Sequence, residues 1–288
     1  MERFRKIRST FFQQLAAISS KKNVLAGFLL GIIIVLKQSV QYSHFVGKHT
    51  VNIAEPFLVT LTGQGDALLV MIGFIIVVAD APFINEGSFF LIHRIGRKAW
   101  YASMWIYITV MGILYQGVLF GASVLPFITK GYMENTWSQT FYLLAQVNGI
   151  TKKMTTYHIG PQNSDMLGFS PYEALLHTFI CVVLYSVGLA AILFVFNMLL
   201  SKHTFGTIGV GLVHMLGMFL YSQPIFGRVL TKWSLFRNAF FPMGYHPDQS
   251  NLLFTYSYLA LLVVVIYMVG VDLLPYTSFV LKAGKENE

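Results

Sequence analysis

Long apolar runs are the feature that most constrains how this chain folds. A helix needs about 20 mainly apolar residues to cross the hydrocarbon core of a bilayer. Only 11% of the 288 residues are charged, whereas an average soluble domain has about 25%. Six segments approach or exceed the required length: Asn23–Val40, Ala67–Ile84, Ala99–Ile128, Ala174–Leu200, Phe205–Ser222 and Leu252–Leu274. The sequence therefore predicts an all-α integral membrane protein with six transmembrane helices.

The first 22 residues predict an amphipathic helix in the membrane interface. Their apolar residues, from Phe4 to Ile18, recur at three- and four-residue steps, and Arg5, Lys6 and Arg8 lie early in the same segment. That pattern is typical of a basic helix whose apolar face enters the headgroup region. The alternative is a disordered basic tail.

The distribution of Lys and Arg predicts that the N and C termini are both cytoplasmic. With the N-terminus inside, 12 of the 20 Lys and Arg fall in the inside segments 1–22, 85–98, 201–204 and 275–288. Only 7 fall in the longer outside segments 41–66, 129–173 and 223–251. Cytoplasmic loops carry the excess of Lys and Arg in most membrane proteins. Lys37, near the end of the first span, is expected to reach the interface.

The predicted organisation is an interfacial helix at 1–22, a transmembrane domain at 23–274 and a cytoplasmic tail at 275–288. Two of the outside segments, 129–173 and 223–251, are long enough to contain short helices. WSQTFYLLAQV, at 137–147, has the amphipathic pattern of one.

Glycines at helical spacing predict close helix packing. Gly27 and Gly31 form a GxxxG pattern in the first span, and Gly206 and Gly209 lie close together in the fifth. Small residues let helix backbones approach closely in lipid. The first and fifth helices are therefore also the candidates for a seam with a second copy of the chain.

Ionisable residues inside the spans are costly in lipid and usually face the bundle interior or water. Asp80 lies near the cytoplasmic end of the second span, and His214 lies midway along the fifth. Each is a candidate for a polar pathway. The alternatives are a pairing role at a helix end for Asp80 and a hydrogen bond between helices for His214.

The sequence lacks the common catalytic and nucleotide-binding motifs. No GxxxxGK[ST], HExxH, GxSxG or cysteine pair with metal-binding spacing occurs. The positive charge forms no basic stripe interleaved with aromatic residues, so no nucleic-acid partner is predicted. We therefore predict no catalytic site, no metal site and no cofactor bound by this chain.

The predicted cytoplasmic segment 85–98 has the pattern of a short helix with an apolar face and a basic end. Asn85 suits an N-cap, Glu86 a first helical turn, and Gly96 a helix stop. Apolar contact comes from Phe89, Phe90, Ile92 and Ile95, and cations at the end come from Arg94, Arg97 and Lys98. The segment suits a groove on a soluble partner, although a topological anchor would also explain its arginines.

Taken together, these features resemble the permease subunits of ABC type-2 exporters, the ABC-2 family. The resemblance covers nearly the whole chain as architecture. Its most specific part is Glu86-Gly87, Phe90-Leu91, Arg94-Ile95-Gly96-Arg97 and Trp100. The resemblance implies that 85–98 is a coupling helix that docks in a groove of an ATPase subunit. Its implied contact residues are Glu86, Phe89, Phe90, Ile92, Arg94, Ile95 and Arg97. Segment 129–173 is longer than is usual in that family.

The resemblance also implies the partners and the location. A separate cytoplasmic ABC ATPase, expected in two copies, would hold ATP and Mg. A second permease would complete a homodimer or heterodimer in a bacterial plasma membrane. The expected function is ATP-driven export, by alternating access, of an amphipathic or hydrophobic substrate such as a peptide, an antibiotic or a lipid. A structural or regulatory membrane subunit is the first alternative, and a membrane-embedded enzyme is the second.

Overall fold

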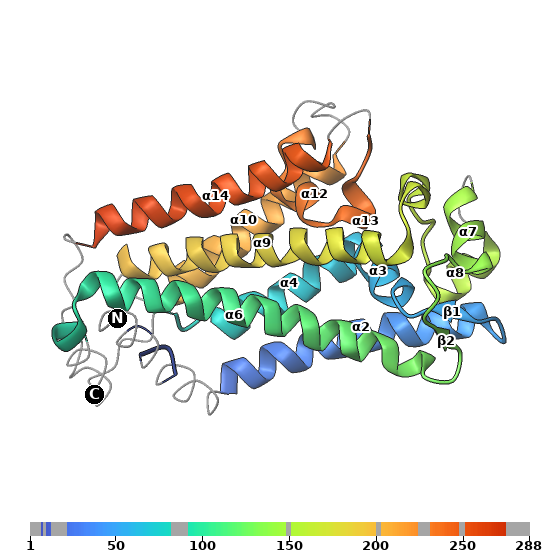
Figure 1. Cartoon of the computed structure of the whole chain (residues 1–288), viewed down its shortest axis with the longest axis horizontal. Helices are drawn as coiled ribbons and strands as arrows, with labels where there is room; N and C mark the ends of the chain where they lie inside the picture. Colours follow the sequence, from blue (N-terminus) through green and yellow to red (C-terminus); the bar gives the residue numbers. More distant parts are fainter. Residues whose placement is uncertain are drawn as a thin grey trace.

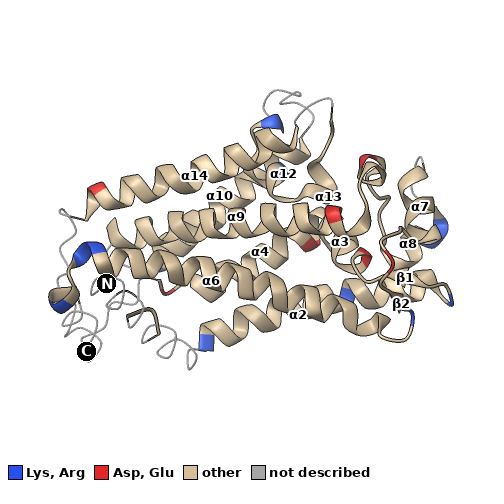
Figure 2. Cartoon of the chain, in the orientation of Figure 1, with Lys and Arg blue, Asp and Glu red and all other residues tan. Residues whose placement is uncertain are grey.

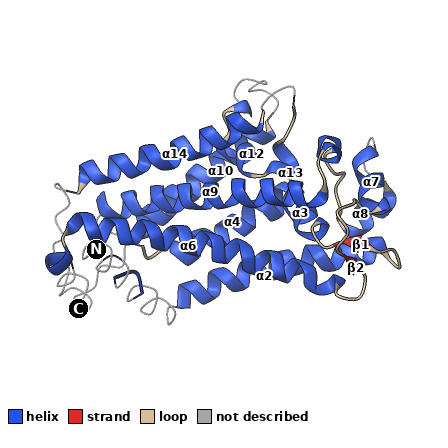
Figure 3. Cartoon of the chain, viewed as in Figure 1, coloured by secondary structure: helices blue, strands red, loops and turns tan. Residues whose placement is uncertain are grey.

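Long helices running side by side form the body of the protein, and a smaller cap closes one end (Figures 1 and 3). The computed structural model describes residues 7, 10–12, 22–81, 92–147, 151–199, 203–223, 231–247 and 251–274. Five of the described helices are long and apolar enough to cross a membrane. They are α2 (Lys22–Val46), α6 (Arg97–Val124), α9 (Pro171–Leu199), α10 (His203–Ser222) and α14 (Leu252–Leu273). An all-α, multi-pass membrane protein is therefore consistent with both sequence and structure.

The predicted outside loop 41–66, which precedes the second span, differs most from the structure. Two helices, α3 (Glu55–Thr62) and α4 (Gln64–Val78), meet at Gly63 with a bend of 99°. The expected outside loop 41–66 therefore contains the last turns of α2 and all of α3. Nearly every residue of α3 is buried, so the helix belongs to the core. An apolar segment of eight residues can be buried in this way although it is too short to span a bilayer.

The cap is built from the segment between α6 and α9, together with residues that follow α2. Two short strands, β1 (Val51–Asn52) and β2 (Gly131–Tyr132), pair in parallel with Val51 opposite Gly131. The other cap elements are η1 (Leu125–Phe127), α7 (Gln139–Gln146), α8 (Lys152–Tyr157) and η2 (Ser164–Gly168). The helix predicted within 137–147 is confirmed as α7. The Ser138 hydroxyl caps its start by accepting a hydrogen bond from the Phe141 amide.

Helix α9 runs through the middle of the bundle. It packs against α6, α10 and α14, and its side chains are apolar on every face, which is typical of a buried helix. Two short helices, α12 (Leu235–Ala239) and α13 (Phe241–Gly244), follow α10 and lie near the capped end (Figure 1). Charged residues gather toward the two ends of the molecule, and the middle is almost free of them (Figure 2). That distribution is expected for a bundle whose middle lies in lipid.

Helices α2 and α4 approach each other closely at a pair of glycines. A Cβ atom placed on Gly27 would lie 2.5 Å from the Gly73 carbonyl oxygen and 2.6 Å from a Val77 methyl group. The backbones of the two helices therefore touch, and neither position has room for a side chain. Close contact of this kind is one of the interactions that holds helices together in lipid.

Replacing Gly27 with valine is expected to lower the unfolding free energy by about 1–3 kcal/mol, because overpacking forces the two helices apart. Thermal unfolding of the detergent-purified protein measures the loss. The same type of change at Gly117 on α6 is the control, since nothing lies within 4 Å of a Cβ there. If the two variants had the same midpoint of thermal unfolding, the α2–α4 contact would not be close.

Candidate functional site

The start of α6 is fastened to the end of α14. The Arg97 side chain donates a hydrogen bond from Nη1 to the Leu274 carbonyl oxygen at 3.1 Å. Arg97 belongs to the predicted coupling segment, and Leu274 directly follows the last helix of the described chain. Two helices that are far apart in sequence are thus joined at the end of the bundle opposite the cap.

Aromatic packing one turn further along α6 reinforces this connection. The Tyr101 hydroxyl donates to the Tyr267 carbonyl oxygen at 3.0 Å, and the Tyr101 ring packs on the rings of Phe194 and Tyr267. Gly270 on α14 leaves the space that the Tyr101 ring fills. Helices α6, α9 and α14 therefore meet in one rigid aromatic cluster, which we call the aromatic clamp: Tyr101, Trp105, Phe194 and Tyr267.

The other predicted coupling residues are only partly described. Glu86, Phe89 and Phe90 lie outside the described residues. A single helical turn at 92–95 precedes α6. Within it Ile92 is buried, Ile95 packs on the core from a half-buried position, and Arg94 is exposed. The described part of the segment thus has an apolar side on the bundle and a cation facing outward.

The four glycines predicted for close packing contact helices of the same chain. Gly27 and Gly31 face α4 and α6, where Gly73 and Tyr115 lie. Gly206 and Gly209 face Asn197 and Phe196 of α9. These glycine faces are covered within the chain, so a seam with a second copy would have to use other faces.

His214 and Asp80 both have hydrogen-bonding partners on neighbouring helices. His214 is buried, with Nδ1 2.7 Å from the Tyr185 hydroxyl oxygen and Nε2 3.2 Å from the Leu68 carbonyl oxygen. The histidine thus bridges α10 to α9 and α4. Asp80, just after α4, accepts a hydrogen bond from the Asn23 amide at 3.2 Å. No group of three or more His, Cys, Asp or Glu that could hold a metal occurs in the described part of the chain.

A buried carboxylate ties the cap to the bundle. Glu55, the first residue of α3, is fully buried and accepts three hydrogen bonds. They come from the Tyr42 hydroxyl of α2 at 3.0 Å, the Ser138 amide at 2.6 Å and the Ser138 hydroxyl at 2.7 Å. No described cation pairs with this carboxylate. These three hydrogen bonds make Glu55 a polar link between α2, α3 and the start of α7.

Asn52 extends the link to the strand pair. Its side-chain nitrogen donates to the carbonyl oxygens of Glu134 at 2.5 Å and Thr136 at 3.3 Å, and its side-chain oxygen accepts from the Ala54 amide. The backbone around Glu55 is thereby fixed to the segment that leads into α7. Nothing in the sequence pairs residue 52 or 55 with residues 134–138, because the contact depends on the cap fold.

The bend between α3 and α4 opens into a polar cavity of about 430 Å³. Residues of α2, both bent helices, the cap, α10 and α13 line it. Irregular backbone at membrane depth is tolerated where protein covers it or where it lines a cavity. Broken helices also form the binding sites of many transporters. The cavity at Gly63 is therefore the first candidate for a ligand site in this chain.

The buried Arg237 positions one wall of this cavity. Its Nε donates to the Gly244 carbonyl oxygen at 3.0 Å, which holds the turn from α12 to α13. Burial lowers the pKa of this guanidinium, which lies near Tyr221. Met243, which follows this turn, lines the cavity. Its carbonyl oxygen accepts a hydrogen bond from the Tyr221 hydroxyl at 3.2 Å.

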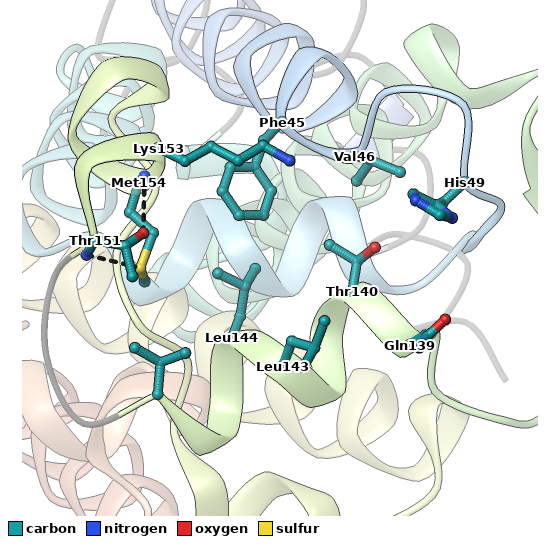
Figure 4. Close-up of a pocket in the computed structure, with 11 residues that line it drawn as sticks. Phe45, Val46, His49, Gln139, Thr140, Leu143, Leu144, Thr151, Lys153 and Met154 are labelled. Carbon is teal, nitrogen blue, oxygen red and sulfur yellow. Dashed lines mark hydrogen bonds between the residues drawn. The ribbon is translucent and has the colours of Figure 1, made fainter.

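A second, smaller hollow of about 290 Å³ lies in the cap between the end of α2, α7 and α8 (Figure 4). Leu143, Leu144 and Phe45 give it an apolar lining. The Lys153 ammonium lies 4.5 Å from the centre of the Phe45 ring, a cation–π distance, and His49 lies at the other edge (Figure 4). Polar residues make up a smaller part of its lining than of the lining of the cavity at the bend.

Comparison with known proteins gives no relative to guide the assignment. No protein-family model, no curated protein and no solved structure matches this chain. The function must therefore be argued from the residues and contacts described above.

Proposed function

We propose that this chain is the membrane-spanning permease subunit of an ATP-driven ABC exporter of the ABC-2 type. The observation that carries the proposal is the fastening of α6 to α14 by Arg97, Leu274 and the aromatic clamp. Segment 85–98 leads directly into α6. A push on that segment would therefore move α6, α14 and α9 together as one body, which is how rigid-body motions are passed through packed helices.

In this proposal α4 is the second of six spans, and α3 turns back into the outer side of the bundle. The termini and segment 85–98 are cytoplasmic, and the cap is outside. The cavity at the bend between α3 and α4 then opens toward the outer side. An exporter that alternates access needs such an outward-facing opening to release its cargo, and the cavity supports the proposal for that reason.

The proposed complex contains two permeases and two copies of a cytoplasmic ABC ATPase that binds ATP and Mg. No P-loop is present in this sequence, so the nucleotide chemistry is assigned to the partner. The cargo is proposed to be an amphipathic or hydrophobic molecule, and the location is a bacterial plasma membrane. The second permease would contact faces other than the glycine faces of α2 and α10.

Co-purification with the ATPase tests the proposal. The chain is expressed with a candidate ABC ATPase and is isolated by an affinity tag in detergent. We expect the ATPase to co-purify with the wild type. We expect at least a tenfold loss with the double change Phe90→Ala and Arg94→Glu, because an apolar contact is removed and a cation is reversed at the docking segment.

Lys48→Glu is the matched control, because it reverses an exposed cation at the capped end. It should leave ATPase binding unchanged. Undiminished ATPase binding by the double variant would make segment 85–98 a topological anchor. If no ATPase co-purified with the wild type, a structural or regulatory membrane subunit would be the better assignment.

A further inference from the structure

The cavity at the bend between α3 and α4 contains a buried amide whose oxygen is unused. Gln38 of α2 lines the cavity and is only 4% exposed. Its side-chain nitrogen donates to the His158 carbonyl oxygen at 3.2 Å. Its side-chain oxygen accepts no hydrogen bond from the described residues. This oxygen is therefore a vacant acceptor in the cavity wall.

Asp66, in the first turn of α4, supplies further vacant acceptors. Its side chain is 18% exposed, and it lines the same cavity. The nearest cation is Lys37, whose nitrogen lies 3.7 Å from a carboxylate oxygen. That distance is an ion pair but exceeds the range of a hydrogen bond. Among the described residues, no donor is hydrogen-bonded to the Asp66 carboxylate.

The one carboxylate among the residues that line the cavity, Asp66, already has a cation beside it. Asp66 faces Lys37, which is 58% exposed, and His246 lies 2.9 Å from the Asp165 carboxylate. Other polar groups of the wall bond to each other, as when the Thr62 hydroxyl donates to the Gln162 side-chain oxygen at 2.8 Å. An anionic ligand would meet the Asp66 carboxylate, and a cationic ligand would have to compete with Lys37 for it. A neutral ligand with several hydrogen-bond donors would fill the vacant acceptors.

We propose that this cavity binds a neutral polyhydroxylated group, such as a sugar ring, whose hydroxyls donate to Gln38 Oε1 and to the Asp66 carboxylate. The volume of about 430 Å³ lies in the range of small-ligand sites. Tyr221 and Pro242 give the wall apolar surface beside the polar groups. The ligand could be a free saccharide or the headgroup of a glycolipid, because both present the same hydroxyls. This inference does not depend on an ATPase partner.

Binding is measured on the full chain in phospholipid nanodiscs prepared without glycoside detergent. Maltose is the neutral probe, and choline and inorganic phosphate are the charged probes, each followed by ligand-observed NMR. We expect maltose to bind the wild type and to bind Asp66→Asn about tenfold more weakly, because a hydrogen bond to a charged group is worth more than one to a neutral group. The charged probes should not compete with maltose.

Two further measurements keep the result interpretable. Gln139→Ala, in the other hollow, should bind maltose as the wild type does. The melting midpoint of Asp66→Asn shows whether the variant is folded. Gln38→Leu, which removes the other proposed acceptor, is a second variant that should bind maltose more weakly. Preferential binding of choline or phosphate, or unchanged maltose binding by both cavity variants, would overturn the proposal.

The source of the sugar is distinguished by lipid composition. If nanodiscs that contain glucosyl diacylglycerol lower the apparent maltose affinity of the wild type, the headgroup of a glycolipid occupies the cavity. If the glycolipid has no effect while maltose binds, the ligand comes from solution. No maltose binding in either kind of nanodisc, and no effect of the glycolipid on the melting midpoint, would also overturn the proposal.

Discussion

Replacing Glu55 with alanine is expected to detach the cap from the helix bundle. The change leaves the Tyr42 hydroxyl, the Ser138 amide and the Ser138 hydroxyl without their acceptor in a fully buried position. Each buried donor left unpaired costs at least about 1 kcal/mol, so the unfolding free energy should fall by roughly 3 kcal/mol. The midpoint of thermal unfolding should then fall by roughly 5 °C for a chain of this size.

The effect should be largest in the cap. Hydrogen exchange of the amides in α7 should accelerate in Glu55→Ala, because the Ser138 cap of that helix loses its anchor. Glu55→Gln should be milder, since the amide oxygen still accepts. Glu173→Ala is the control for removing a carboxylate, because Glu173 is exposed and its hydrogen bonds within the described residues come from the neighbouring Ser170. If exchange in α7 were unchanged in Glu55→Ala, the cap would be held mainly by its apolar contacts.

Replacing Gly270 with valine is expected to uncouple α14 from α6. A Cβ atom at this position would overlap the Tyr101 side chain, whose ring is enclosed by Phe194 and Tyr267. The aromatic clamp would have to open, at a cost of about 1–3 kcal/mol. In the proposed exporter, a push on segment 85–98 would then move α6 without α14.

Labelling of an introduced cysteine measures the coupling. The native Cys181 is fully buried, so Gln64→Cys at the cavity wall can be labelled selectively with a maleimide. In proteoliposomes with the ATPase, we expect ATP to change the labelling rate at residue 64. Gly270→Val should reduce that change at least tenfold, whereas ATPase co-purification should stay intact.

Gly211→Val on α10 is the control, because nothing lies within 4 Å of a Cβ there. This variant should keep the ATP-dependent change in labelling. A full ATP response in Gly270→Val would show that the clamp does not transmit movement between the helices. In that case the coupling proposal would lose its main structural support.

The sequence alone predicts much of the helix bundle. Apolar runs place α6, α9, α10 and α14 within a few residues of their bounds, because length and hydrophobicity are local properties. The first helix continues to Val46 rather than Val40, since its last turns pack on the cap through Phe45 and Val46. Polar residues such as Gln41, Ser43 and His44 hide this extension in a hydropathy pattern.

The bend at Gly63 is the main feature that composition did not reveal. The apolar octet 55–62 is too short to span, and its polar flanks resemble a loop. Glycines at positions 63 and 65 were the available signal, because two glycines in one turn weaken a helix. Lys37 of α2 pairs with Asp66 of α4, and neither residue gives a sequence signal of that contact.

The candidate sites depend on contacts between distant parts of the chain. Arg97 was predicted as a functional cation, but its partner is a backbone carbonyl at residue 274 that carries no sequence signal. Glu55 was not predicted as a cap anchor, since its donors lie at residues 42 and 138. The cavity joins Gln38 and Asp66 to residues as far along the chain as His246.

By itself, the sequence determined that the chain forms long apolar helices with charged ends, because the transfer of each apolar run into lipid depends only on its own residues. The tertiary structure decided that one run bends into two helices, that a carboxylate is buried under a cap and that a polar cavity remains at the bend. Those features depend on which side chains meet. A buried polar group is stable only when donors from other elements reach it.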